Sequence, residues 1–178
     1  NKGAVMTISL LMSCRASYRS GEENDRREGE TTMSEKFIPL SETFWVSPQI
    51  TPEEAAVAAD KGVTLIVNNR PDGEAPGQPK SDAIAAAAEK AGISYIHIPV
   101  DGRGVTPGHI SALKEALEAN KGGKALGFCR TGTRSTILRA YVEASEGRAP
   151  EEIIAEAAKA GYDISGHAPA LKALGGAA

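Results

Sequence analysis

The chain of 178 residues carries 20 Lys and Arg against 23 Asp and Glu, a formal net charge of −3, and only 4% of its residues are aromatic. A chain without a basic stripe and with few stacking rings is not expected to bind nucleic acid. Its two cysteines, Cys14 and Cys129, lie in regions of different character, and no Cys/His spacing matches a zinc site. These features predict a reduced, cytoplasmic protein that needs no metal or other cofactor.

Residues 1–34 are predicted to lie outside the folded domain, as a disordered tail or a leader. The apolar run over 4–13 is too short to cross a membrane, and the charged segment after it has no apolar period. A small residue before Cys14 also allows a minority interpretation, export or lipid anchoring through residues 1–14. The prediction is one catalytic domain over 35–178 with no membrane contact.

Strands and helices alternate along the rest of the chain. A hairpin or edge strand pair is predicted over 36–47, and short apolar runs predict buried strands over 63–69, 93–100 and 124–129. Helices are predicted to begin after the caps Thr51, Ser81 and Thr106. Two more are predicted, one near 135–146 and one that begins at Pro150. This order predicts a three-layer α/β/α fold with a mainly parallel central sheet.

A polar segment follows each of the three predicted buried strands: "NNRPDGE", "DGRG" and "CRTGTRS". Ligands of parallel sheets bind outside the carboxyl ends of the strands. Asp72, Asp101 and Cys129 are therefore expected at one edge of the sheet, although they are far apart in sequence.

The segment "CRTGTRS" (129–135) places a thiol at the end of a buried strand and a guanidinium at the start of a helix. Gly132 permits a positive φ, and the amides of 130–133 can form an anion cradle reinforced by the helix N-terminus. Arg134 adds a planar fork that matches two oxygens of an oxyanion. This positive environment favours the thiolate of Cys129, which predicts a nucleophile facing a bound oxyanion.

The remaining candidates for substrate binding lie around this thiol and guanidinium. They are Arg130, Thr131, Gly132, Thr133 and Ser135 in the loop, with Arg70 and Asp72 in the earlier "RPDGE" segment. The expected substrate is a small molecule that carries an oxyanion.

Three segments together resemble the phosphatase-like domain of the beta-lactamase-hydrolase-like proteins, a bacterial group related to protein tyrosine and dual-specificity phosphatases. They are "CRTGTRS" (129–135), "VNNRPDGEAPGQP" (67–79) and "YIHIPVDGRGVTP" (95–107). The resemblance covers about 36–170 and implies a tyrosine-phosphatase-like fold. It implies that Cys129 attacks a phosphomonoester to form a covalent intermediate, while Arg134 binds the oxyanion. Because the resembling domain is often fused to a metallo-hydrolase, it also implies such a partner acting in trans.

Two features depart from the tyrosine phosphatases. Four residues, not five, separate Cys129 from Arg134, and Phe128 stands where those enzymes usually carry His. The four-residue gap resembles the active-site loop of rhodanese sulfurtransferases. This resemblance implies an alternative, a sulfurtransferase that forms a Cys129 persulfide from a donor of sulfane sulfur in place of a phosphomonoester. A non-catalytic anion-binding module is a second alternative.

The general acid for phosphoryl transfer is predicted to be Asp101, because it follows the strand before the catalytic one and lies beside Gly102. A simple Asp-Gly turn explains this residue equally well. Asp72 has a similar turn explanation, and Arg70 is expected to pair with Asp72 or Glu74 or to face the pocket. The three histidines are not spaced as metal ligands.

Overall fold

The computed structural model describes residues 36–176, so the predicted tail or leader over 1–34, with Cys14, lies outside the described residues. The described strands are β1 (Ile38–Pro39), β2 (Phe44–Ser47), β3 (Val63–Asn68), β4 (Ser94–His97) and β5 (Lys124–Phe128). The helices are α2 (Pro52–Asp60), α3 (Ser81–Lys90), α4 (Pro107–Ala119), α5 (Thr133–Ser145), α6 (Pro150–Lys159), the 3₁₀ turn η1 (Ser165–His167) and α7 (Ala168–Gly175).

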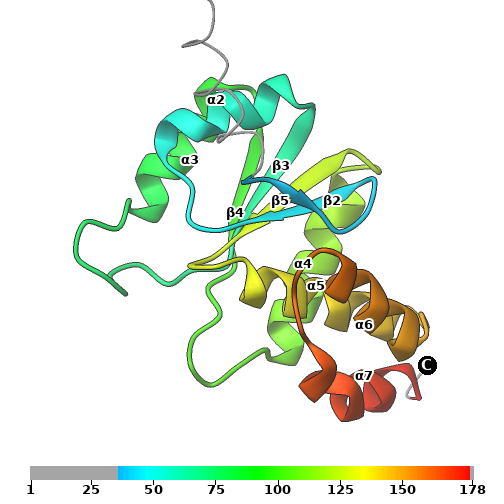
Figure 1. Ribbon diagram of the computed structural model, residues 1–178. Coiled ribbons are helices and arrows are strands. Elements are labelled where there is room, and N and C mark those ends of the chain that lie inside the picture. The colour runs from blue at the N-terminus through cyan, green and yellow to red at the C-terminus, as the bar shows by residue number, and fades with distance from the viewer. Residues whose placement is uncertain (1–35, 177–178) are drawn as a thin grey trace, which may run out of the picture.

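These five strands form one sheet in the order β1-β2-β5-β3-β4. The β1–β2 pair is antiparallel, which confirms the predicted edge pair, and the other neighbouring strands run parallel. Helices α2 and α3 cover one face of the sheet and α4 to α7 cover the other (Figure 1). The predicted three-layer α/β/α arrangement is therefore confirmed.

Side chains alternate between two hydrophobic cores along the central strands. In β3, Leu65 and Val67 pack toward α4 to α7, whereas Ile66 packs toward α2 and α3. In β5, Ala125 belongs to the first core and Leu126 to the second. Cys129 lies four residues after Ala125, so the two-residue period of a strand assigns it to the same face, which α5 covers.

The helix starts follow from their capping residues. The amide of Thr51 donates to Oε2 of Glu54 at 2.7 Å, which completes the predicted capping box of α2. Thr106 caps α4, and Pro150 occupies the first turn of α6. Helix α3 already includes Ser81, the residue predicted to cap it, and its N-cap is Lys80.

Strand β4 ends earlier than the predicted strand over 93–100. Pro99 has no amide proton to give to the ladder, so regular pairing with β3 stops at His97. The amides of Ile98 and Val100 still donate to the carbonyls of Asn68 and Asn69, at 2.8 and 3.0 Å. The segment to Val100 therefore stays attached to the end of β3, and it carries Asp101 to the same edge as Cys129.

Candidate active site

The loop between β5 and α5 is built around Cys129, whose side chain is fully buried. Its amide donates to the carbonyl of Ser47 at 3.4 Å, and the carbonyl of Phe128 accepts from the amide of Asn69 at 2.8 Å. The strands on both sides of β5 thus hold the point where the thiol leaves the sheet. Gly127, two residues earlier, lets α5 approach closely, because a Cβ there would lie 3.1 Å from the Cβ of Ser135.

Gly132 turns the chain into α5 with a φ of +95°, as the sequence predicted for this position. Its amide donates to Sγ of Cys129 at 3.1 Å, and its carbonyl accepts from the hydroxyl of Thr136 at 3.0 Å. The sulfur therefore lies beside the N-terminus of a 13-residue helix, an environment that favours negative charge.

Arg134 is held by two acceptors on other segments. Its Nη1 donates to Oε1 of Glu74 and to the carbonyl of Val100, both at 2.7 Å, and its Nη2 donates to Oε2 of Glu74 at 2.9 Å. These bonds occupy both protons of Nη1 and one of Nη2. Within residues 36–176, the edge formed by Nε and the second Nη2 proton makes no hydrogen bond to a protein oxygen, so it can receive an oxyanion.

The pKa of Arg134 depends on Cys129 as well as on Glu74. Hydrogen bonding to Glu74 raises the pKa of Arg134, desolvation opposes this, and the charge of Cys129 raises it further. The same contact with Arg134 lowers the pKa of Glu74 to about 2. A fixed positive group next to the sulfur is what a thiolate nucleophile requires.

Arg70 continues this network behind Glu74. Its side chain is 6% exposed; Nε donates to Oε2 of Glu74 at 2.8 Å and Nη1 donates to Oε1 of Gln49 at 2.9 Å. The backbone amide of Gln49 in turn donates to the carbonyl of Arg130 at 3.4 Å. Arg130 and Arg134 are therefore linked through three side chains that lie outside the loop.

The position of Arg70 is set by its own backbone. Its amide donates to Oδ1 of Asn68 at 2.9 Å, and its carbonyl lies 2.9 Å from Nε2 of His97. The histidine, which the sequence placed inside a strand, thus supports the segment that carries Glu74.

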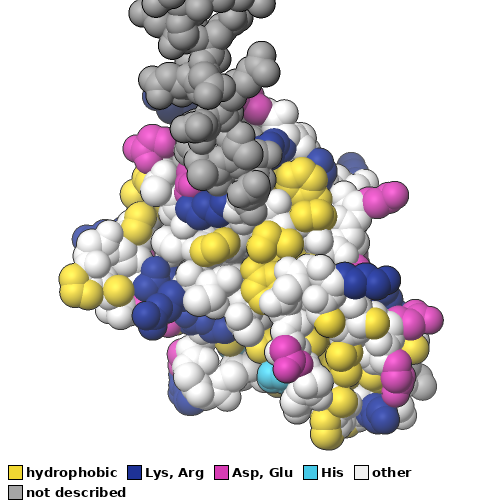
Figure 2. All heavy atoms as spheres, in the orientation of Figure 1, with side chains coloured by type: hydrophobic (Ala, Val, Ile, Leu, Met, Phe, Trp, Pro, Cys, Tyr) yellow, Lys and Arg dark blue, Asp and Glu magenta, His cyan; other side chains and the backbone are white. Residues whose placement is uncertain are grey.

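The rest of the loop surface is polar and partly exposed. The hydroxyls of Thr131 and Thr133 lie 3.1 Å apart, and Arg130 is exposed, whereas Ser135 is fully buried and its hydroxyl has no partner among the described residues. Figure 2 shows Lys and Arg side chains gathered on the surface beside this loop.

Asp101 lies next to the site but faces solvent. It follows Val100, whose carbonyl contacts Arg134, and its carboxylate is bound by Arg103 with Nη2 to Oδ2 at 2.7 Å. Hydrogen bonding to Arg103 lowers the pKa of Asp101, which favours the ionised carboxylate. A hollow of about 460 Å³ adjoins it, lined by Pro71, Pro99, Asp101, Arg103, Thr106 and His109.

Within residues 36–176, the carboxylate of Asp72 bonds the start of α3 and not the active-site loop. Its Oδ1 accepts the amide of Ser81 at 2.9 Å, at the start of α3, and it makes no contact with Cys129 or Arg134 among the described residues. The structure thus brings Arg70 toward the loop through Glu74, and it gives Asp72 a role in starting α3.

Sequence reasoning missed three residues that shape the site. Glu74 was considered only as a partner of Arg70, and Gln49 and Tyr162 were not considered at all. Tyr162 donates from its hydroxyl to the carbonyl of Thr131 at 3.3 Å. Glu74 directly follows "RPDG", so its charge beside Arg70 was a signal in the sequence that could have identified it. Gln49 and Tyr162 lie in segments that carry no such signal.

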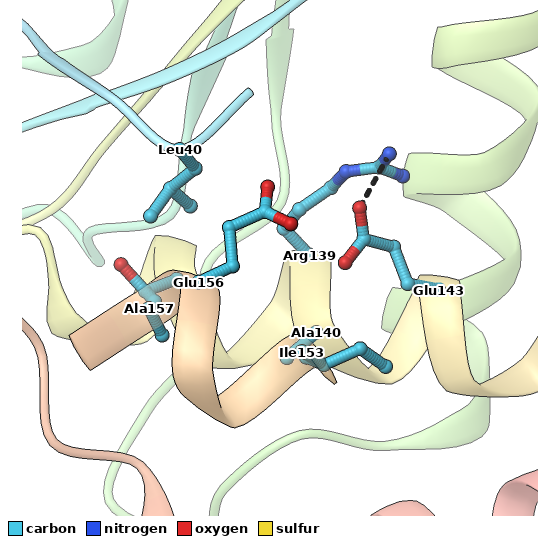
Figure 3. A pocket seen from close by; sticks show the side chains of 8 residues that line it. Leu40, Arg139, Ala140, Glu143, Ile153, Glu156 and Ala157 are labelled. Carbon is cyan, nitrogen blue, oxygen red and sulfur yellow. Dashed lines mark ion pairs between the residues drawn. The ribbon is translucent and has the colours of Figure 1, made fainter. Parts of the chain in front are cut away.

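A separate small cavity lies between α5, α6 and Leu40, which follows β1, and its lining includes the ion pair of Arg139 with Glu143 (Figure 3). Arg139 pairs with Glu143 at 2.8 Å, and Arg148 pairs with Glu143 at 3.0 Å. Burial raises the pKa of Glu143. The space inside is only about 10 Å³, about that of one water, so the cavity is too small to hold a substrate.

Across residues 36–176, no three His, Cys, Asp or Glu side chains group as metal ligands. None of the helices in that range combines the length and apolar character needed to cross a membrane.

The sequence of this chain is similar to those of known proteins. A family model described as beta-lactamase hydrolase-like protein, phosphatase-like domain, matches residues 36–146. Beta-lactamase hydrolase-like proteins of Xylella fastidiosa and Agrobacterium fabrum are 36% and 32% identical over 130 residues. Each alignment covers 72% of this chain and 30% of the relative, so the chain spans about 30% of the length of these relatives.

Solved structures share the fold. A candidate phosphatase from Neisseria meningitidis has a TM-score of 0.66 at 31% identity, covering 77% of this chain and 96% of that one. TpbA from P. aeruginosa, solved in complex with pTyr, has a TM-score of 0.58 at 17% identity, covering 82% and 91% of the two chains. At this lower identity, the second likeness shows the fold alone.

Proposed function

Because the chain belongs to the beta-lactamase hydrolase-like family through its phosphatase-like domain, we propose that it is a cysteine-dependent phosphatase that acts on a small phosphomonoester. The observation that carries the proposal is the edge of Arg134 that bonds no protein oxygen within residues 36–176 and lies beside the buried thiol of Cys129. Glu74 and the carbonyl of Val100 hold the guanidinium in place, which supports a role of Arg134 as an oxyanion donor that is oriented before a substrate arrives.

The chemistry proceeds in two displacements at phosphorus. In the first, the Cys129 thiolate attacks, the S–P bond forms, and the bond from phosphorus to the ester oxygen breaks. In the second, water attacks the phosphocysteine, the S–P bond breaks, and inorganic phosphate leaves with the thiolate restored. Arg134 and the loop amides hold the non-bridging oxygens through both steps, where their negative charge is redistributed.

Asp101 serves as the general acid in this proposal. Its proton goes to the departing ester oxygen in the first displacement, and it takes a proton from the attacking water in the second. The ion pair with Arg103 favours the ionised carboxylate, so the acid form requires this pair to open when the substrate is bound. The neighbouring hollow, which both side chains line, has room for the leaving group.

Trapping the covalent intermediate tests the proposal directly. The full chain is mixed with an aryl phosphate, quenched in acid and examined by intact-protein mass spectrometry, with Asp101→Asn as the variant that preserves the nucleophile. A mass gain of one phosphoryl group that maps to Cys129 is expected, and Cys129→Ser is the matched control. Turnover of the aryl phosphate by Cys129→Ser at the unaltered rate would remove the thiol from the mechanism.

A rhodanese-type sulfur transfer is the second candidate, and the four-residue spacing from Cys129 to Arg134 favours it. In that reaction the thiolate attacks the outer sulfur of thiosulfate, the S–S bond breaks, and sulfite leaves as an anion. Cyanide then takes the outer sulfur from the persulfide as thiocyanate and restores the thiolate. No external acid is required, so Asp101→Asn is expected to be nearly silent.

The same mass measurement separates the two candidates. A gain of one sulfur on Cys129 after thiosulfate, with no phosphoenzyme trapped from the aryl phosphate, would replace the first candidate by the second. Binding of vanadate or phosphate without either adduct would identify a non-catalytic anion-binding module. A metallo-hydrolase partner in trans and a cytoplasmic location remain part of the proposal for the protein as a whole.

A further inference from the structure

Tyr162 reaches the active-site loop from the segment after α6. Its side chain belongs to the core between the sheet and α4 to α7, and its hydroxyl donates to the carbonyl of Thr131 at 3.3 Å. The phenol also lies against the Cα of Gly132, because a Cβ built there would overlap the Tyr162 oxygen. Tyr162 thus contacts the loop at Gly132, whose amide bonds the sulfur.

The peptide between Thr131 and Gly132 connects the tyrosine to the thiol. Its carbonyl accepts from Tyr162, and its amide donates to Sγ of Cys129 at 3.1 Å. A trans peptide is planar, so its C=O and N–H point in opposite directions. Fixing the carbonyl on one side therefore aims the amide at the sulfur on the other.

The end of α6 sets the direction of Tyr162. The amide of Tyr162 donates to the carbonyl of Ala157 at 2.9 Å, and the amide of Gly161 donates to that of Ala158 at 3.0 Å, with Gly161 at a φ of +89°. These are the two bonds of a Schellman motif, a rigid helix ending. The tyrosine is therefore presented by a fixed element and not by a free loop.

The Tyr162 hydroxyl keeps its proton at neutral pH and therefore remains a hydrogen-bond donor. Burial raises the pKa of Tyr162, and the charge of Cys129 raises it further, so the phenol stays protonated. The charge of Cys129 also raises the pKa of Arg134, which remains charged.

We propose that Tyr162 is a positioning residue of the active site, whose phenol orients the 131–132 peptide so that the Gly132 amide stabilises the Cys129 thiolate. It lies beyond residues 36–146, the range that the family model matches, so the site needs the C-terminal helical segment to be complete. This inference rests on the proposed role of Cys129 as the nucleophile.

The test reads the thiol without any substrate, so that it stands apart from the identity of the reaction. The full chain is alkylated with iodoacetamide across a pH series, and the modification of Cys129 is followed by peptide mapping, which separates it from Cys14. For Tyr162→Phe, the midpoint pH of alkylation is expected to rise by about half a unit, because a hydrogen bond to the charged form is weakened. Tyr141→Phe is the matched control, since Tyr141 bonds His167 and does not contact the loop.

A second variant distinguishes orientation from packing. Tyr162→Leu lacks the donor as Phe does, but it also loses ring contacts in the core. The proposal predicts the same rise in midpoint for both variants and an unchanged midpoint for Tyr141→Phe, whatever their melting temperatures. An unchanged midpoint in Tyr162→Phe, or a rise in Tyr162→Leu alone, would show that the tyrosine only fills space. Absence of phosphatase activity would bear on the proposed function and leave this result untouched.

Discussion

Two loops at the same edge of the sheet are held in opposite ways. The loop over 129–132 is anchored by Ser47, by Tyr162 and by the start of α5, and its cysteine is fully buried. The loop over 101–104 is held by its own Asp101, which bonds Arg103, and the side chains of these residues are 44% and 90% exposed. The first loop is braced by other parts of the chain, so we expect it to be rigid before a substrate arrives, whereas the second has few restraints and is expected to rearrange more easily.

The difference corresponds to the two tasks of the proposed reaction. The oxyanion changes little in shape between substrate and intermediate, so fixed donors can stabilise it without reorganisation. The general acid must meet the leaving group of each substrate and then let the product depart, which suits a loop with few restraints. We therefore expect substitutions in the first loop to affect every substrate and those in the second to depend on the leaving group.

The largest effect is expected from Cys129→Ser. A serine hydroxyl stays protonated near neutral pH and cannot replace the thiolate, so turnover of an aryl phosphate should fall by a thousandfold or more, on the order of what nucleophile removal costs. The buried site accepts the smaller oxygen, so the fold is retained, as circular dichroism would verify. Cys14→Ser is the matched control and is expected to leave turnover unchanged; a comparable loss there would contradict the assignment of the nucleophile.

Arg134→Lys should be nearly as damaging. A lysine keeps the charge but cannot bond Glu74 through two nitrogens and still offer a two-pronged edge to the oxyanion. We expect kcat/KM to fall about a hundredfold, with weaker inhibition by vanadate, an anion that fills the cradle. Arg148→Lys is a suitable control, because it changes an ion pair with Glu143 that lies in the separate cavity. Equal vanadate affinity in Arg134→Lys would mean that the oxyanion binds elsewhere.

Glu74→Gln tests how the rigid loop is braced, with a smaller expected effect. The amide keeps the shape but loses the charge that two arginines share, so we expect about a tenfold loss of kcat/KM. Because the folded-state pKa of Glu74 is lowered to about 2, its stabilisation is fully present above about pH 4.5 and is lost as the pH falls toward 2.

The stability of the Glu74→Gln variant provides the check. Unfolding midpoints are compared with those of the unmodified protein at pH 7 and at pH 3. The gap between the two proteins should narrow at pH 3, because the Glu74 carboxyl of the unfolded chain then binds a proton while the folded carboxyl stays largely ionised, which lowers the stability of the unmodified protein alone. A gap that stays constant with pH would show that Glu74 braces Arg134 by shape and not by charge.

Much of this arrangement follows from local sequence rules. Alternation of apolar runs with capped helices predicted the parallel sheet, and the rule that loops meet at the carboxyl edge predicted that Cys129 and the segment of Asp101 lie together. A positive φ at the turn into α5 was predicted from the presence of Gly132 in the loop. These inferences use residues that are close in sequence or rules that apply to every sheet of this kind.

The supporting contacts could not be predicted in the same way. Arg134 and Glu74 are separated by 60 residues, and their contact depends on the path of the irregular segment over 70–80. The bond from Tyr162 to Thr131 depends on where α6 ends against α5. Pro99 did carry a signal that the predicted strand would stop early, since it lacks an amide proton. Such contacts are decided by tertiary packing, which no local pattern encodes.

Arg103→Ala gives the smallest expected effect and bears on the free loop. Hydrogen bonding to Arg103 lowers the pKa of Asp101, so removal of the guanidinium should let that pKa rise toward its ordinary value. If Asp101 donates a proton in the first displacement, the fall in rate on the alkaline side of the pH profile, measured with a poor leaving group such as an alkyl phosphate, should move to higher pH. With a good leaving group, which departs without a proton, the profile should not move.

A shift of the same size for both substrates would show that Arg103 acts on the oxyanion site, and the contrast between a rigid loop and a free one would then fail. Arg130→Ala, which alters an exposed arginine beside the nucleophile, is the control for a general loss of positive charge.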